Sequence, residues 1–410
     1  MSSQAEIAER AYAVTTTNYR PAPIVFERGQ GMWLYDAAGK RYLDFAAGIA
    51  VRALGHNHPA LTTAIADQAR KLLHVSNLWI NRPAVELMET LTRLSFADRV
   101  YFANSGAEAN EAALKLARRY HQAVRGDTQR FRFVCTTGSF HGRTWAAISA
   151  TGQPKYHKGF APLVPGFDHV PYGDAAAVEA AITDETAAVL VEPIQGEGGI
   201  LVPEDGYLEA LRDICDRHGV LLIFDEVQTG VGRTGRWFGH QHSKIVPDIL
   251  SSAKGLGGGV PIGAMLCTEE VGQGFVPGVH ASTYGGNPLV CAASLAVLRT
   301  IEAEDLLANV ESTGALLGAG LDDLAGTVDG AIEARGRGLM RALAVDPQAI
   351  DRRAVKASCE ERGLLLTLAG PDALRLTPPL IAGPAHVEQA LEVLREALLD
   401  VVRRGGEAGV

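Results

Sequence analysis

Short apolar runs alternate with helical patterns through the middle of the chain. Residues 99–103 (RVYFA) have the composition of a strand, and residues 107–120 then place Ala113, Leu116 and Tyr120 on one face of a helix. Further apolar runs predict strands at 131–136, 187–191, 220–224, 249–252 and 263–268, and an amphipathic helix is expected at 207–218. Because these runs lack polar alternation, the strands should be buried on both faces, which predicts an α/β fold with a mainly parallel sheet wrapped by helices.

The two ends of the chain have a different pattern of predicted helices and strands. Residues 32–35 and 41–44 flank an Ala-Ala-Gly turn and resemble a small hairpin. After about residue 300 the helices are longer, with strand-like pieces at 336–345 and 363–368. At about 150 residues per domain, 410 residues predict two or three domains. We expect an N-terminal segment over 1–45, a large domain over 46–300 and a small C-terminal domain over 301–410.

Composition and charge limit the class of protein. Apolar residues make up 47% of the chain and charged residues 21%, which is typical of a folded protein. The 38 Lys and Arg against 47 Asp and Glu give a net charge of −9, which argues against a nucleic-acid or membrane partner. Any bound phosphate must then be held locally. The 45 glycines, about one residue in nine, exceed the usual share of roughly 7%.

The cysteines and the N-terminus indicate a compartment. The cysteines are odd in number, widely spread and form no CxxC, so neither a disulfide framework nor a zinc site is expected. They are Cys135, Cys215, Cys267, Cys291 and Cys359. Residues 1–20 lack the apolar core of a signal peptide, and no run of 18 apolar residues occurs. A cytoplasmic protein is the expectation.

A turn at 104–110 (NSGAEAN) joins the first predicted strand to its helix. Gly106 would let the backbone approach a ligand, and the free N–H groups of a first helical turn form an anion site without basic side chains. The alternative is an ordinary strand-to-helix connection that Ser105 caps.

An acidic pair, Asp225 and Glu226, follows the strand predicted at 220–224. Ligands of open α/β sheets bind at the carboxyl ends of strands, so an acid at this position suggests a functional site. Burial of Asp225 would require a cation. That cation is either a protonated ring nitrogen of a cofactor or the side chain of an Arg or Lys.

A lysine, Lys254, follows another predicted strand and precedes a run of glycines, 255–259. Such an amine could enter a cleft and form a Schiff base, although a surface lysine before a flexible turn is the alternative. The chain order of anion site, acid and lysine matches the needs of pyridoxal phosphate. Its phosphate takes backbone donors, its ring nitrogen an acid and its aldehyde an amine.

Three other motifs are weaker. Residues 230–235 spell GxGxxG, but no helical pattern follows them, which argues against a dinucleotide site. Ser251 and Lys254 form an SxxK without the accompanying SDN and KTG motifs. The histidine pairs at 56/58 and 240/242 have no third ligand at a suitable spacing, so no metal site is expected.

Seven ordered motifs resemble those of the class III pyridoxal-phosphate aminotransferases. The match extends from about residue 33 to about residue 379. The motifs are 102–111 (FANSGAEANE), 140–144 (FHGRT), 152–156 (GQPKY), 192–199 (EPIQGEGG), 225–230 (DEVQTG), 254–259 (KGLGGG) and 282–288 (STYGGNP). The resemblance implies a fold-type I transferase, with a large domain around a mainly parallel sheet and a smaller α+β domain formed by the C-terminal part and the N-terminal segment. It also implies a homodimer with shared active sites.

The resemblance assigns the cofactor site residue by residue. Lys254 would hold the cofactor covalently and serve as the acid–base group, and Asp225 would keep the ring nitrogen protonated. Phe140 would stack on the ring, and Thr283 would reach the phosphate in the partner subunit. The full set of expected cofactor contacts is Ser105, Gly106, Ala107, Phe140, Asp225, Glu226, Val227, Gln228, Lys254 and Thr283.

The resemblance also assigns the substrate site. Arg143 would bind a carboxylate, since a guanidinium binds carboxylates bidentately. Arg375 would take the α-carboxylate of glutamate, and Glu197 would neutralise Arg375 when a substrate with a distal amine is bound. Ser282 would contact that substrate.

Within the family the motifs favour members that act on N2-acetyl-L-ornithine. The expected reaction moves its distal amino group to 2-oxoglutarate, in arginine biosynthesis. A preference for succinylornithine or 4-aminobutyrate is the alternative inside the family. A catalytically silent protein that binds pyridoxal phosphate is the alternative outside it.

Overall fold

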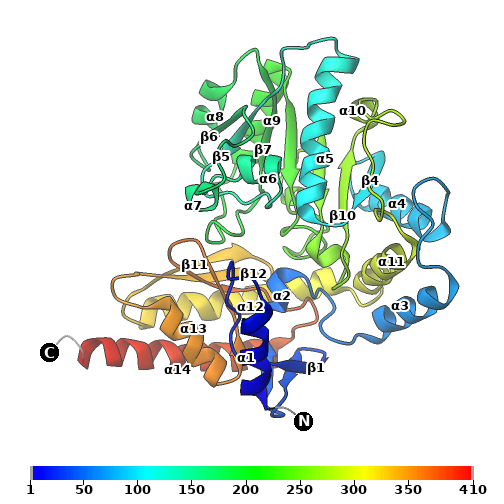
Figure 1. Cartoon of the computed structure of the whole chain (residues 1–410). Coiled ribbons are helices and arrows are strands. Elements are labelled where there is room, and N and C mark those ends of the chain that lie inside the picture. The colour runs from blue at the N-terminus through cyan, green and yellow to red at the C-terminus, as the bar shows by residue number, and fades with distance from the viewer. Residues whose placement is uncertain (1–2, 408–410) are drawn as a thin grey trace.

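A seven-stranded sheet lies at the centre of the upper part of the molecule (Figure 1). The computed structural model describes residues 3–407, with side chains through residue 404. The strand order is β4-β10-β9-β8-β7-β5-β6, and only β10 runs against its neighbours. The α/β class and the mainly parallel sheet are therefore confirmed. The strands are β4 (Arg99–Ala103), β5 (Arg132–Thr136), β6 (Phe167–Val170), β7 (Thr186–Val191), β8 (Leu221–Asp225), β9 (Ile249–Ser252) and β10 (Gly263–Cys267).

Both faces of this sheet are covered, as the unbroken apolar runs predict. In β7, Leu190 belongs to the same hydrophobic cluster as Leu116 of α5 (Gly106–Arg119), and Val189 belongs to a second cluster with Leu211 of α9 (Tyr207–His218). Shorter helices complete the two layers. They are α6 (Trp145–Ala150), α7 (Pro154–His157), α8 (Ala175–Ala181) and α10 (Glu269–Gly272).

A group of helices flanks the β4 edge of the sheet. Helix α11 (Pro288–Ala303) packs against α3 (Pro59–Lys71) and α4 (Arg82–Leu94), and a short α2 (Ala47–Ala50) precedes them. Within residues 3–407, none of the helices combines the length and the hydropathy needed to cross a bilayer.

Two four-stranded sheets form the lower part of Figure 1. One joins the ends of the chain, because Leu43 of β3 pairs in parallel with Leu364 of β13. This sheet has the order β1-β2-β3-β13, and the other has the order β11-β12-β15-β14. The elements of this part are α1 (Gln4–Val14), β1 (Phe26–Gln30), β2 (Trp33–Asp36), β3 (Arg41–Asp44), α12 (Leu306–Thr327), β11 (Ala331–Arg337), β12 (Met340–Val345), α13 (Arg352–Glu361), β13 (Leu364–Leu365), β14 (Thr367–Ala369), β15 (Ala373–Leu376) and α14 (Pro384–Glu407).

The strand-like piece predicted at 336–345 contains β12 (Met340–Val345), together with the end of β11 and the turn that joins the two strands. Gly338 has a φ of +55°, and a Cβ on it would lie 2.8 Å from the carbonyl oxygen of Arg233. The chain therefore reverses between β11 and β12 against the 230–235 loop. The piece predicted at 363–368 divides in the same way into β13 and β14. The domain boundaries expected near residues 45 and 300 stay predictions.

Candidate active site

A cavity of about 440 Å³ opens at the carboxyl ends of the large sheet's strands. Strands β4 and β9 both run against β10, so their carboxyl ends lie at the same edge as those of β7 and β8. The chain following each of these strands therefore contributes to the lining. Predicted site residues in the lining are Ser105, Gly106, Ala107, Phe140, Arg143, Glu197, Asp225, Val227, Gln228 and Lys254.

One end of the cavity is the start of helix α5. The Ser105 hydroxyl accepts a hydrogen bond from the Glu108 N–H at 3.2 Å and caps the helix. Gly106 and Ala107 form the first turn, where N–H groups have no intrahelical acceptor. A Cβ on Gly106 would lie 2.8 Å from both methyl carbons of Val227, so this close packing requires glycine. The turn offers backbone donors to an anion.

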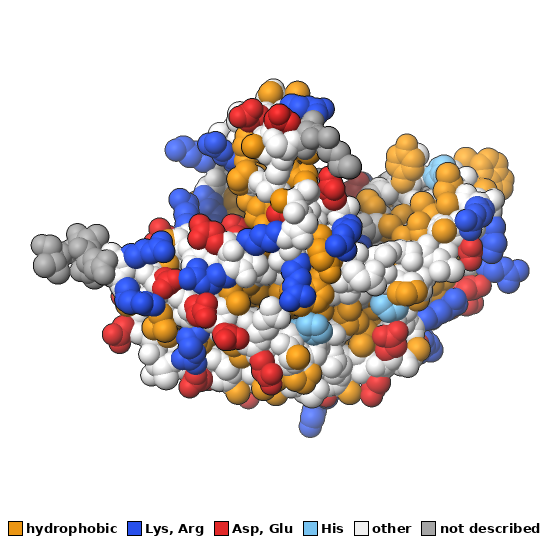
Figure 2. Space-filling view, turned by 90° about the horizontal axis from the view of Figure 1, so that it is seen from below, with side chains coloured by type: hydrophobic (Ala, Val, Ile, Leu, Met, Phe, Trp, Pro, Cys, Tyr) orange, Lys and Arg blue, Asp and Glu red, His pale blue; other side chains and the backbone are white. Residues whose placement is uncertain are grey.

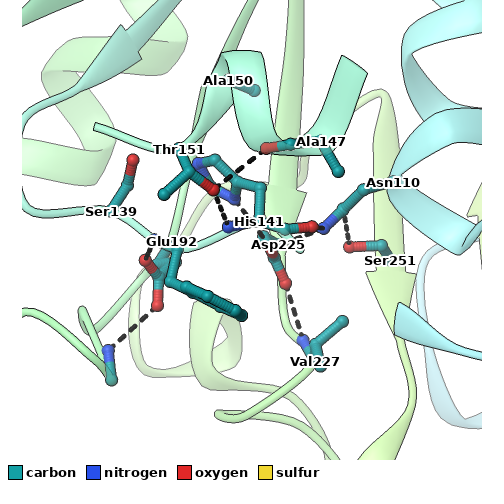
Figure 3. Close-up of polar contacts among 12 residues, drawn as sticks. Asn110, Ser139, His141, Ala147, Ala150, Thr151, Glu192, Asp225, Val227 and Ser251 are labelled. Carbon is teal, nitrogen blue, oxygen red and sulfur yellow. Dashed lines mark hydrogen bonds and ion pairs between the residues drawn. The ribbon is translucent and has the colours of Figure 1, made fainter. Parts of the chain in front are cut away.

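Asp225, at the end of β8, is buried and closely held (Figure 3). Its Oδ2 accepts a hydrogen bond from Asn110 Nδ2 at 2.7 Å and lies 2.8 Å from His141 Nδ1, and its Oδ1 accepts from the Val227 N–H at 3.0 Å. Burial by itself raises the pKa of Asp225. The contact with His141 and these hydrogen bonds outweigh that effect and hold the pKa below its usual value. Asp225 therefore presents a carboxylate to the cavity.

A second layer fixes the residues around Asp225. Ser251 Oγ donates to Asn110 Oδ1 at 2.6 Å, and Asn110 Nδ2 also donates to the backbone oxygen of His141 at 2.8 Å. The His141 N–H donates to Thr151 Oγ1 at 2.9 Å. These contacts restrict the amide and imidazole groups that touch Asp225, so the carboxylate has a defined position.

Glu192, after β7, is a further carboxyl group in the lining. It accepts hydrogen bonds from the N–H groups of Phe140 and Gly196, each at 2.9 Å. Burial raises the pKa of Glu192 to about 7. The group therefore carries a proton over part of the neutral range, unlike Asp225.

Lys254 follows β9 and lines the same cavity. Its backbone φ of +40° lies in the left-handed region, in a short turn before the glycine run. Burial lowers the pKa of the Lys254 ammonium to about 8, with Glu197 opposing the shift. A larger share of the amine is therefore neutral and nucleophilic near neutral pH than for an exposed lysine.

Arg375, on β15, lies behind Glu197. Its guanidinium forms an ion pair with Glu197 and donates to Thr367 Oγ1 at 2.9 Å and to Gln228 Oε1 at 3.4 Å. Burial opposes ionisation of Glu197, but Arg375 and Lys254 hold its pKa below the usual value. Glu197 lines the cavity and Arg375 does not, so the carboxylate covers the cation.

Arg143, unlike the buried Arg375, is open to solvent. Its side chain is exposed, and within residues 3–407 it forms no salt bridge. Its guanidinium carbon lies 4.0 Å from the centre of the Tyr156 ring and 5.5 Å from that of Phe140. The cavity therefore holds one open guanidinium, and a second one lies behind a carboxylate.

Besides Arg375, three predicted contacts lie outside the cavity lining. Ser282 and the exposed Thr283 line a neighbouring cavity of about 320 Å³, where Ser282 Oγ accepts from Asn104 Nδ2 at 3.0 Å. The Glu226 carboxylate turns the other way and is hydrogen bonded to His240, whose Nδ1 lies 2.8 Å away. The expected contact of the Glu226 side chain with a ligand is therefore not provided by this arrangement.

The prediction missed Asn110, His141, Glu192 and Ser251. The first three lie inside the quoted motifs, but their roles come from contacts across long stretches of chain. Asn110 is 115 residues from Asp225, and His141 is 84 residues from it. The local signal for His141 is limited to its place beside a glycine in the segment between β5 and α6.

Comparisons with known proteins cover nearly the whole chain. The family model "Aminotransferase class-III" matches residues 14–398. The acetylornithine aminotransferase of Gloeobacter violaceus is 53% identical over 92% of this chain and 93% of its own, and that of Synechocystis is 49% identical over 94% and 91%.

Solved structures are similar as well. An ornithine aminotransferase from Toxoplasma gondii has a TM-score of 0.95 at 34% identity, over 98% of this chain and 97% of its own. An acetylornithine aminotransferase from Elizabethkingia anophelis has a TM-score of 0.87 at 32% identity, over 98% and 100%.

Proposed function

The chain belongs to the class III aminotransferases, and from that premise we propose that it acts on N2-acetyl-L-ornithine. The reaction transfers the distal amino group to 2-oxoglutarate and gives N-acetyl-L-glutamate 5-semialdehyde and L-glutamate. Relatives with about half of their residues in common with this chain are acetylornithine aminotransferases, which supports the substrate.

The observation that carries the proposal is the unequal state of the two arginines. Acetylornithine has one carboxylate and a distal amine, whereas glutamate has two carboxylates. Arg143 is open and suits the carboxylate remote from the reacting amine, which is the α-carboxylate of acetylornithine and the side-chain carboxylate of glutamate. Arg375 is covered by Glu197, so the site is neutral there for acetylornithine, and Glu197 must move aside before glutamate or 2-oxoglutarate can bind.

The residues of the cavity fit pyridoxal phosphate, the cofactor of this family. The first turn of α5 has donors for a phosphate, Asp225 is a carboxylate for a ring nitrogen, and Lys254 is an amine with a lowered pKa. Phe140 would stack on the ring, and Gln228 would lie near the ring hydroxyl. When bound, the cofactor supplies an aldehyde that condenses with amines and a protonated ring that withdraws electrons from the adjacent carbon.

The chain's own side chains then perform distinct tasks. Asp225 stays ionised because Asn110 and His141 hold it, so it can keep a ring nitrogen protonated. Lys254 Nζ would accept the proton that leaves the amine-bearing carbon of the substrate and donate it to the former aldehyde carbon of the cofactor. Arg143 orients the substrate through its carboxylate. A catalytically silent protein would not need Lys254, Asp225 and Arg143 at one cavity.

The proposal includes a homodimer with shared active sites. Thr283 lies in an exposed segment beside the cavity, where it could reach a partner's phosphate, and Ser282 next to it could reach the substrate once a partner closes the neighbouring cavity. Hydrophobic side chains also gather at the right-hand end of the face in Figure 2. Leu78, Trp79 and Ile80 are 75%, 67% and 88% exposed, which suits a surface that a second copy covers.

The proposed setting is the cytoplasm, within arginine biosynthesis. The five cysteines are free and buried, which suits a reducing compartment. The net charge of −9 suits small amino-acid and 2-oxo-acid substrates held by local arginines, without a nucleic-acid partner.

A panel of amino donors tests the proposed function. Steady-state rates are measured with acetylornithine, ornithine, succinylornithine and 4-aminobutyrate, with 2-oxoglutarate as acceptor. We expect the highest kcat/KM for acetylornithine, and Lys254→Ala should lower turnover by several orders of magnitude while the protein stays folded. A much higher kcat/KM for any other donor would refute the substrate assignment.

A further inference from the structure

The ring of Tyr156 lies against the open guanidinium of the cavity, that of Arg143. The Arg143 guanidinium carbon lies 4.0 Å from the centre of the Tyr156 ring, well within the range of a cation–π contact. Phe140 meets the Tyr156 ring edge to face, at 5.7 Å and 80°. We propose that Tyr156 is a positioning residue that pre-orders Arg143 for substrate carboxylates. This proposal rests on the proposed function, in which Arg143 binds those carboxylates.

The backbone that carries Tyr156 is anchored on both sides. Before it, Gln153 Nε2 donates to the carbonyl oxygens of Gly138 and Ser139, each at 3.1 Å. After it, His157 Nε2 lies 2.9 and 2.8 Å from the carbonyl oxygens of Ile148 and Thr151. Helix α7 is only four residues long, so these contacts and not the helix itself fix the position of the ring.

The N–H groups of Arg143 have no protein partner in the part of the chain that the structure describes, where Arg143 forms neither a hydrogen bond nor a salt bridge. A ring that stacks on a guanidinium occupies its flat face, whereas a carboxylate binds to the N–H groups in its plane. An exposed arginine has many rotamers and loses that freedom when a substrate orders it. Tyr156 removes part of this loss before the substrate arrives, so its effect should fall on binding and not on the chemical step.

Lys155 is the competing explanation. Its ammonium nitrogen lies 4.8 Å from the centre of the same ring, so the ring could serve Lys155 in place of Arg143. If the ring serves Lys155, removal of the Lys155 side chain should have the same effect as removal of the Tyr156 ring. If the ring serves Arg143, it should have no effect.

The experiment compares holoenzyme variants at residue 156. Tyr156→Leu removes the ring, Tyr156→Phe keeps it, and a trifluorinated phenylalanine keeps its shape while removing the negative charge of its face. KM and kcat are measured for acetylornithine and 2-oxoglutarate. The Kd of glutarate, an unreactive dicarboxylate, is measured by calorimetry. Tyr35→Leu is the matched control, because the Arg28 guanidinium carbon lies 3.4 Å from the centre of the Tyr35 ring, and neither residue lines the cavity.

We expect Tyr156→Leu to raise both KM values and the Kd of glutarate by about three- to thirtyfold, with kcat and the cofactor absorbance unchanged. The fluorinated ring should behave like leucine, and Tyr156→Phe, Lys155→Ala and Tyr35→Leu should behave like wild type. The fluorinated variant keeps the packing, so it carries the test if the leucine variant does not fold.

Three results would overturn the role of Tyr156. The first is an unchanged Kd for glutarate in the leucine and fluorinated variants. The second is a loss of the cofactor band, which would mean that the Tyr156 ring supports Phe140 and not Arg143. The third is a Lys155→Ala variant that matches Tyr156→Leu. A wild-type enzyme that does not use acetylornithine as a donor refutes the proposed function instead. The glutarate measurements still test the role of Tyr156 in that case.

Discussion

Glu197→Gln separates the two kinds of amino donor. The change keeps the size of the side chain and removes the charge that covers Arg375. Arg375 is 2% exposed, so water does not replace the lost carboxylate, and its remaining partners are Thr367 and Gln228. A hydrogen bond to a charged group contributes about 1.5–3 kcal/mol, and each 1.4 kcal/mol is a factor of ten.

Glutamate gains that amount in the variant, because its carboxylate no longer has to displace a charged competitor. Acetylornithine gains nothing and faces an uncovered cation. We therefore expect the ratio of kcat/KM for glutamate to kcat/KM for acetylornithine to rise by about 10- to 150-fold.

Single-turnover reactions of each donor, followed by cofactor absorbance, give this ratio directly. Glu302→Gln is the control, since Glu302 pairs with Arg93 on the surface, at 2.7 Å, and neither residue lines the cavity. A Glu197→Gln ratio within twofold of wild type would refute the idea that Glu197 screens Arg375.

Three further predictions follow from single contacts. Attachment of pyridoxal phosphate to the cofactor-free protein should accelerate as pH rises through about 8, because burial disfavours the Lys254 ammonium and only the neutral amine attacks; a stopped-flow midpoint near 10.5 would contradict this. Glu226→Gln should lower the free energy of unfolding in urea by about 2–4 kcal/mol and leave the Kd of the cofactor unchanged, because its carboxylate binds buried donors away from the cavity. Gly106→Ala should weaken cofactor binding by about tenfold or more in an absorbance titration, since the new methyl group lies 2.8 Å from Val227, whereas Gly326→Ala, with no atom within 4 Å, should not.

Strongly patterned elements of the fold could be predicted, and interrupted ones could not. Helix α9 has the predicted bounds, 207–218, because its apolar face is continuous. Strand β6 was missed, since its Asp168 pairs with Arg132 of β5 and breaks the apolar run. Strand β15 was missed for a similar reason. Its Arg375 is buried only because Glu197, 178 residues earlier, supplies a charge.

The residues of the candidate site also divide into those that the sequence predicts and those that it does not. Residues that directly follow strands, such as Asp225 and Lys254, were predicted because the carboxyl ends of parallel strands meet at one edge. The neighbour Glu226 was included by adjacency, yet consecutive residues leave a strand on opposite sides. The support from His141 depends on folded contacts that no local pattern contains, and the role of Thr283 depends on a second subunit.

The sheet that joins β3 to β13 gives the chain an order of assembly. Residues 41–44 find their partner only when residues 364–365 have been synthesised, more than three hundred residues later. At about 5–20 residues per second, the ribosome takes at least about fifteen seconds to make that stretch. The seven-stranded sheet uses residues 99–267 and can form during this wait. The N-terminal hairpin therefore waits for a partner that lies more than three hundred residues away, and a nascent chain that stalls before residue 364 leaves that edge open to aggregation.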